Sequence, residues 1–109
     1  MVKIRNNKIT ITRGDTLETT VAITTSEGEA YIPAEGDQIR FALKKSYTDA
    51  TPIIVKSIPN DTLTLRVEAS ETKQLSVGSY VYDIELTTAD GYVDTFIDKQ
   101  TLVITEEVY

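Results

Sequence analysis

The sequence predicts an all-β protein, an antiparallel β-sandwich of about seven to nine strands, and three observations support this prediction. Apolar and polar residues alternate with a period of two along most of the chain, which is typical of strands with one buried and one solvated face. Threonine, valine, isoleucine and tyrosine, which suit a pleated surface, are frequent in these runs. Turn residues such as Gly, Asp and Pro separate one run from the next.

The alternating runs cover residues 8–12, 17–24, 38–44, 62–68 and 80–87. Asp90-Gly91 follows the last run and is a strong hairpin signal. Beyond it, we expect strands over residues 92–97 and 100–105, or one long strand with a bulge near Asp98-Lys99.

Residues 52–58 form a short apolar segment that begins with a proline. Because proline cannot donate a ladder hydrogen bond, the segment is expected at a strand start or a sheet edge. We predict that it pairs with residues 62–68 across the turn Pro59-Asn60-Asp61.

Residues 69–75 interrupt the period of two and predict one short helical turn near residues 70–75. Ser70 is the expected helix cap, and Glu71 suits the positive end of the helix dipole. We expect Gly78 to end the turn in a left-handed conformation. The spacing Leu75-x-x-Gly78-x-Tyr80 resembles the tyrosine corner of Greek-key sandwiches, in which a buried hydroxyl donates to the backbone a few residues upstream.

Length and composition indicate one domain, residues 1–109, with no catalytic apparatus. The chain has no cysteine and no histidine, so a thiol nucleophile and the commonest general base and metal ligand are missing. We therefore expect no enzyme activity, no metal and no cofactor. The net charge of −6 disfavours nucleic acid as a partner, and no apolar run is long enough for a signal peptide or a membrane span.

Two patterns that could suggest binding sites have plainer explanations. Arg13-Gly14-Asp15 matches the integrin-binding tripeptide, but Gly and Asp are also the residues expected where a strand turns. Acidic residues recur near loops without the Asp-x-Asp-x-Asp-Gly pattern of a calcium loop, so we interpret them as a solubilising surface.

Contact residues for a partner are expected on sheet edges and among exposed tyrosines. We predict that the first strand, residues 8–12, and the last, residues 102–105, are edges. The candidate interface residues are Lys8, Thr10, Thr12, Tyr31, Tyr47, Tyr92, Val103 and Thr105.

Residues 3–16, 35–44, 78–86 and Asp90-Gly91 together resemble a known family. The chain looks like the short immunoglobulin-like proteins encoded among the tail and baseplate genes of tailed phages and prophages of Gram-positive bacteria. It is similar to the N-terminal domain of phage baseplate upper proteins. The resemblance implies a non-enzymatic virion component that docks other tail or baseplate proteins, assembles in the bacterial cytoplasm and forms a homo-oligomer. The chain lacks the long C-terminal extension that contacts receptor-binding proteins in larger members, which puts a direct role in host recognition in doubt.

Two other functions fit a sandwich of this size. A carbohydrate- or ligand-binding module would stack sugars on planar side chains, for which Tyr31, Tyr47, Tyr92 and Phe96 are available. The chain could also be a cell-surface adhesion domain excised from a larger protein, although it begins with Met1 and has no signal peptide.

Overall fold

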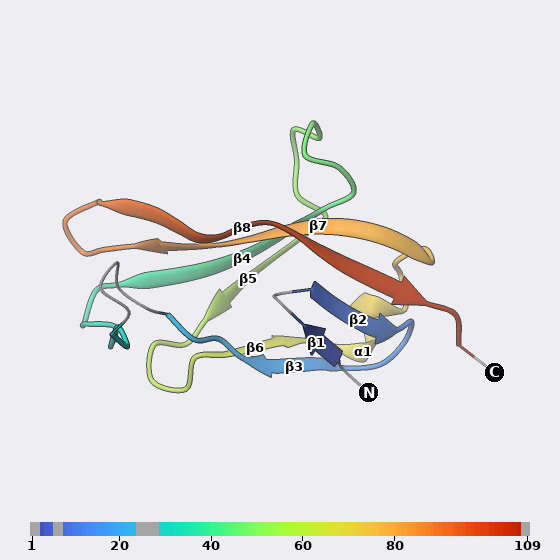
Figure 1. Ribbon diagram of the computed structural model, residues 1–109, viewed down its shortest axis with the longest axis horizontal. Coiled ribbons are helices and arrows are strands. Elements are labelled where there is room, and N and C mark those ends of the chain that lie inside the picture. Colours follow the sequence, from blue (N-terminus) through green and yellow to red (C-terminus); the bar gives the residue numbers. More distant parts are fainter. Residues whose placement is uncertain (1–2, 6–7, 24–28, 108–109) are drawn as a thin grey trace.

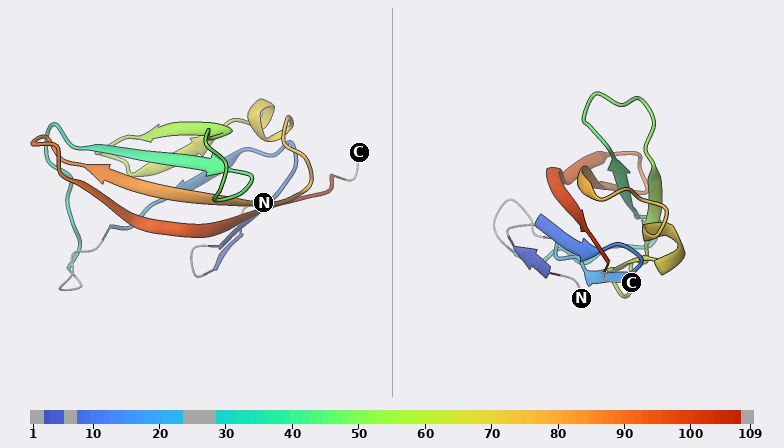
Figure 2. Two further views of the ribbon diagram at one scale, coloured as in Figure 1. Left: turned by 90° about the horizontal axis from the view of Figure 1, so that it is seen from above. Right: turned by 90° about the vertical axis from the view of Figure 1, so that its right-hand side faces the viewer.

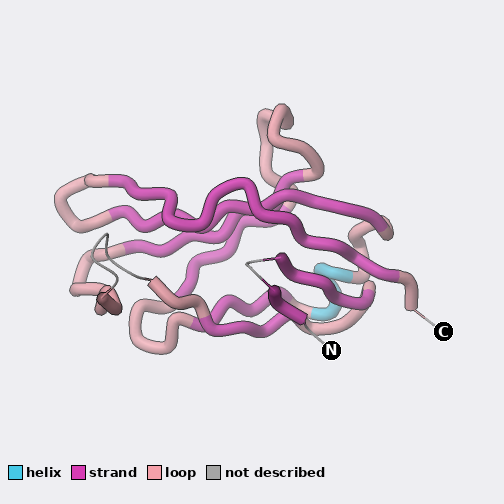
Figure 3. The backbone as a smooth tube through the Cα atoms, viewed as in Figure 1, coloured by secondary structure: helices cyan, strands magenta, loops and turns pink. Residues whose placement is uncertain are grey.

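Two unequal sheets stack into a β-sandwich in the computed structural model, which describes residues 3–5, 8–23 and 29–107 (Figure 1). Six strands form the larger sheet in the order β1-β2-β8-β7-β4-β5, and β3 pairs with β6 in the smaller one. The elements are β1 (Lys3–Arg5), β2 (Lys8–Thr12), β3 (Leu17–Thr20), β4 (Gln38–Lys44), β5 (Ile54–Ile58), β6 (Thr64–Val67), α1 (Ala69–Thr72), β7 (Gly78–Thr87) and β8 (Val93–Thr105). Strands account for most of the described chain (Figure 3). The all-β sandwich predicted from the period of two is therefore confirmed.

The core lies between the two sheets, and the larger sheet curves around the smaller one (Figure 2). On β4, Ile39, Phe41 and Leu43 are buried while Gln38 and Arg40, which alternate with them, are exposed. The ring centroid of Phe41 lies 5.5 Å from that of Tyr82 on the neighbouring strand β7. Burial raises the pKa of the Tyr82 hydroxyl to about 12, because the charged phenolate is disfavoured in an apolar core.

One strand pair departs from the predicted antiparallel arrangement. Strand β2 runs parallel to β8, in a register from Ile9 opposite Leu102 to Thr12 opposite Thr105. Short strand β1 pairs antiparallel with the other side of β2, and β7 pairs with the other side of β8. Residues 8–12 and 102–105 are therefore interior, and the prediction that they are edges is wrong. The edges of the larger sheet are β1 and β5.

The predicted pairing of residues 52–58 with residues 62–68 is also wrong. Strand β5 pairs with β4, with Ile39 opposite Ile58, whereas β6 pairs with β3 in the other sheet. Between the two strands Leu63 has a positive φ of 52°, and β6 begins only at Thr64, in the other sheet. The expectation that this segment lies at a strand start or a sheet edge is met, because β5 is an edge strand of the larger sheet, although Pro52 itself lies two residues before it.

The run predicted over residues 17–24 forms a shorter strand, and Thr24 lies outside the described residues. Beyond Thr20, Val21 and Ile23 remain buried although they belong to no strand. The Val21 N–H donates to the Leu63 carbonyl oxygen at 2.7 Å, and the backbone N–H of Tyr31 donates to the Ile23 carbonyl oxygen at 2.8 Å. The alternation therefore predicted burial correctly and overestimated strand length.

Strand β8 is one continuous strand with the predicted bulge. Its pairing with β7 moves from Gln100 opposite Tyr82 to Ile97 opposite Ile84, which inserts one extra residue at positions 98–99. A second irregularity follows, because Thr95 rather than residue 96 lies opposite Glu85. Such bulges increase the local twist and help a long sheet to curve.

Helix α1 is shorter than predicted and is capped differently. Glu68, in an extended conformation, is the cap residue instead of Ser70, and its N–H donates to the Glu71 carboxylate at 3.2 Å. The helix ends at Thr72, with Lys73 as its C-cap, so Gly78 does not end it. Gly78 has a positive φ of 144° but is the first residue of β7.

Candidate functional site

The connection into β7 is fixed by Tyr80, whose side chain is 3% exposed. Its hydroxyl donates to the Ser76 carbonyl oxygen at 2.8 Å, which is the bond that the Leu75-x-x-Gly78-x-Tyr80 spacing predicts. Leu75 is likewise buried in the core. The Lys45 ammonium lies 4.5 Å from the Tyr80 ring centroid and donates to the Ser79 carbonyl oxygen at 3.2 Å. These contacts tie the segment between α1 and β7 to the body of the sheet.

The Arg13-Gly14-Asp15 turn is held against the same end of the molecule. The Arg13 guanidinium donates to the Leu75 carbonyl oxygen at 2.8 Å and to the Glu107 carboxylate at 2.7 Å. Lys73 pairs with the other Glu107 oxygen at 2.5 Å. Since Arg13 is engaged by these groups, the tripeptide acts as a structural turn, in which Gly14 supplies a φ of 88°.

Five predicted interface residues share one surface, which we call the outer face: the side of the larger sheet that points away from β3 and β6. Thr10 lies opposite Val103 and Thr12 opposite Thr105, each pair alternating with buried residues of β2 and β8. Lys8 follows the same alternation and is exposed. This part of the outer face is therefore built mostly from β-branched, uncharged side chains.

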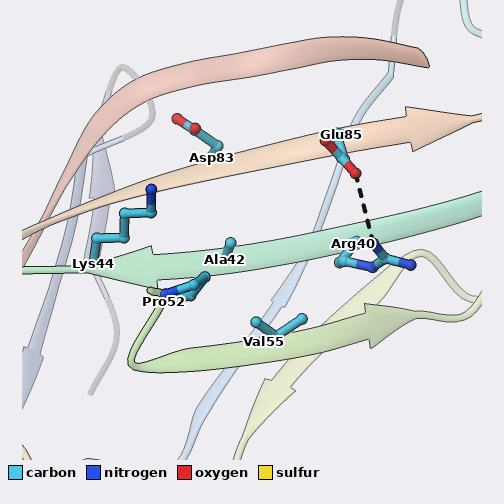
Figure 4. A pocket seen from close by; sticks show the side chains of 7 residues that line it. All are labelled: Arg40, Ala42, Lys44, Pro52, Val55, Asp83 and Glu85. Atoms are coloured by element: carbon cyan, nitrogen blue, oxygen red, sulfur yellow. Dashed lines mark ion pairs between the residues drawn. The ribbon is translucent and has the colours of Figure 1, made fainter. Parts of the chain in front are cut away.

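A hollow lies further across the outer face, over β4, β7 and β5 (Figure 4). It is lined by Arg40, Ala42, Lys44, Pro52, Val55, Asp83 and Glu85. Strand β4 contributes its cations and β7 its carboxylates, and Arg40 pairs with Glu85 at 3.8 Å. None of these residues was a candidate from the sequence, because the two strands carry opposite charges that become neighbours only through their pairing.

Loop 45–53, which connects β4 to β5, rises from the outer face beside the hollow (Figure 1). It carries Tyr47, which is 54% exposed, and Ile53, which is 48% exposed. Val55 at the start of β5 is similarly exposed. Exposed apolar side chains thus accompany the hollow on this side, and Pro52 and Val55 themselves line it.

Tyr31 and Tyr92 lie together at the other end of the molecule from the Arg13 turn, along a shallow depression with Ala34, Asp37 and Asp90. The Tyr31 hydroxyl donates to Asp37 Oδ2 at 2.5 Å, and the Ala34 N–H donates to the same oxygen at 2.9 Å. These bonds lower the pKa of the Asp37 carboxyl and raise that of the Tyr31 hydroxyl. Tyr92 is 67% exposed. Tyr47 lies elsewhere, on loop 45–53, and the Phe96 side chain is outside the described residues.

Within the described ranges, no three acidic, histidine or cysteine side chains gather as a metal site. In the same part of the chain, no helix has the length and apolar character needed to cross a bilayer. Comparisons with family models, curated proteins and solved structures found no match. The outer face, its hollow and the tyrosine depression are thus the surfaces on which a function can be argued.

Substitution Tyr80→Phe should lower the free energy of unfolding by about 1–2 kcal/mol, because the Ser76 carbonyl oxygen loses its donor in a part-buried site. Urea denaturation followed by circular dichroism measures the change. Tyr92→Phe removes an exposed hydroxyl and should leave stability within about 0.5 kcal/mol of the wild type. Equal effects of the two substitutions would contradict a structural role for the Tyr80 hydroxyl.

Stability should depend on pH through Glu107, whose carboxyl pKa is lowered first by Lys73 and then by Arg13. A carboxyl with a lowered native pKa stabilises the fold fully above its unfolded value, and this contribution is lost as pH falls through the native value. The wild type should therefore lose more stability between pH 6 and pH 3 than Glu107→Gln does. Parallel losses in the two proteins, measured by urea denaturation across this range, would remove Glu107 as a source of acid sensitivity.

Proposed function

We propose that the chain is a non-enzymatic assembly module of a phage or prophage particle that docks other tail or baseplate proteins on its outer face. The observation that carries the proposal is the outer face itself, a broad sheet surface with β-branched side chains on β2 and β8 and exposed apolar residues around loop 45–53. The resemblance of residues 3–16, 35–44 and 78–86 to the tail and baseplate family indicates the kind of particle to which the chain would belong. Assembly would take place in the bacterial cytoplasm, and the chain would remain in the virion.

Docking would combine the burial of apolar and aromatic side chains on this face with main-chain hydrogen bonds at the sheet edges. Covering Val103, Val55 and Ile53 removes apolar surface from water, at roughly 25 cal/mol per Å². Tyr47 is the kind of exposed aromatic that anchors interfaces. The edge strands β1 and β5 could in addition pair with strands of neighbouring subunits.

The immunoglobulin-like character of the sandwich is part of the same proposal. It is supported by the Tyr80 hydroxyl bonded to the Ser76 carbonyl oxygen, the feature that gives the tyrosine corner its name. A buried tyrosine bonded in this way at the start of a long strand is common to Greek-key sandwiches, so it favours the class without identifying a member.

Substitution Val103→Lys should weaken docking at least about tenfold, because an unpaired charge would be buried at the interface. The test is co-expression of the chain with each tail protein encoded beside it, followed by size-exclusion chromatography and titration of the complex. Thr20→Lys, on the exposed face of β3 in the smaller sheet, is the matched control and should bind normally. Docking that tolerates Val103→Lys but not Thr20→Lys would assign the function to the opposite sheet.

A second candidate, a glycan-binding module, is favoured by the tyrosine depression. Tyr92 offers an exposed ring beside Tyr31, and Asp37 and Asp90 place carboxylate oxygens along the same depression. Exposed rings beside hydrogen-bonding groups suit sugar recognition.

If the depression binds glycans, Tyr92→Ala should reduce binding to any hit on a glycan array at least about tenfold, through loss of the stacking ring. Tyr47→Ala, which removes an exposed tyrosine from loop 45–53, is the control and should leave such binding unchanged. An array without hits would eliminate this candidate.

A further inference from the structure

Charges on the outer face are arranged in two opposite rows. Strand β4 presents Arg40 and Lys44, and the adjacent strand β7 presents Asp83 and Glu85 (Figure 4). The register puts Arg40 opposite Glu85 and Ala42 opposite Asp83. The four charges sum to zero, although the whole chain carries −6. The β7 row would therefore repel a polyanion, and the β4 row would repel a polycation.

A surface with adjacent rows of opposite charge is complementary to its own copy. If a second molecule is turned by 180° about an axis that is parallel to the strands and lies between β4 and β7, its β4 row faces the first molecule's β7 row. Positions along the strands are unchanged by this rotation, so Arg40 of each copy faces Glu85 of the other. Twofold pairing of this kind is the commonest symmetry of protein assemblies.

We propose that a second copy of this chain docks on the hollow through this twofold arrangement. The inference rests on the proposed docking function of the outer face and names one occupant of it. The Arg40–Glu85 pair within each chain leaves both groups available, because their side chains are 50% and 36% exposed and lie 3.8 Å apart. An exposed pair of this kind contributes little in isolation, and a second partner for each charge in a partly desolvated contact contributes more.

Loop 45–53 fits the same arrangement. It rises on the β5 side of the hollow, near the end of β4. The twofold rotation carries the loop of each copy over β8 of the other, where Thr101 and Val103 alternate outward with the buried Leu102. Tyr47 and Ile53 would then be covered by the β-branched part of the outer face. Arg40, Glu85 and the exposed apolar groups of loop 45–53 thus acquire partners, whereas Lys44 and Asp83 of one copy face Val81 and Ala42 of the other.

The test exploits the twofold axis by mixing two variants. In an Arg40→Glu homodimer two carboxylates face each other at both contacts, and in a Glu85→Arg homodimer two guanidinium groups do. Each variant alone should self-associate at least about tenfold more weakly than the wild type. In a mixture, the substituted position of each chain faces an opposite charge on the other, and the two unchanged groups also face each other. The mixture should therefore form a one-to-one heterodimer with near wild-type affinity, measured by sedimentation velocity and native mass spectrometry.

The mixing result separates association from effects within one chain, because the like-charge pair inside each variant persists in the mixture. Arg66→Glu, on β6 of the smaller sheet, is the matched charge reversal and should leave self-association unchanged. Circular dichroism verifies that every variant is folded. A wild type that remains monomeric at all concentrations tested, or variants whose mixture stays monomeric, would overturn the proposal. Either outcome leaves the Val103→Lys experiment with tail proteins to decide the proposed function separately.

Discussion

The burial of every second side chain on β4 and β7 is the constraint on which the rest of the structure depends. Phe41 is fully buried, and its ring packs against Tyr82 on the adjacent strand. Because side chains on a strand alternate, fixing Phe41 inward directs Arg40 and Ala42 outward. A slip of one residue in the β4–β7 register would exchange core and surface, so the core itself selects the charge pattern of the outer face.

The inequality of the two sheets has a structural consequence for binding. Two strands, β3 and β6, cover the inner side of the larger sheet together with segments such as Val21–Ile23. Among the described residues, loop 45–53 rises from the outer side of the same sheet (Figure 1). Residues as distant in sequence as Thr10 and Val103 meet on this side because β2 and β8 pair in parallel. This part of the outer face is therefore assembled from strands near the two ends of the sequence.

Local patterns predicted much of the fold. The period of two identified the strands and their buried residues, and the combination of Leu75, Gly78 and Tyr80 predicted a hydrogen bond that the structure contains. The bulge at positions 98–99, where β8 carries one extra residue, was also predicted. These features depend on neighbours within a few residues, which a sequence displays directly.

Strand pairing could not be obtained in this way. Strand β5 pairs with β4 and β6 with β3, and the positive φ of Leu63 between β5 and β6 is a conformation that nothing in a leucine predicts. The interior position of β2 depends on a three-residue strand, β1, whose apolar pattern is too short to recognise. The charges of the hollow come from positions 40–44 and 83–85, and they become one site only when β4 and β7 are known to pair. The sequence therefore offered candidates strand by strand, and the charge pattern shared by β4 and β7 was not among them.

The distribution of charge along the molecule bears on how two copies would meet. Residues 29–37 and 88–95 lie at one end and contain five carboxylates and no lysine or arginine, which leaves twelve acidic and eleven basic residues in the rest of the chain. A twofold axis parallel to the strands brings these two acidic ends to the same end of a dimer, where they repel. Salt would screen this repulsion within about 10 Å at 0.1 M, and it would also weaken the Arg40–Glu85 contacts. Such a dimer is polar, with one acidic end and one end that carries the Arg13 turns, so its two ends would accept different neighbours in a larger particle.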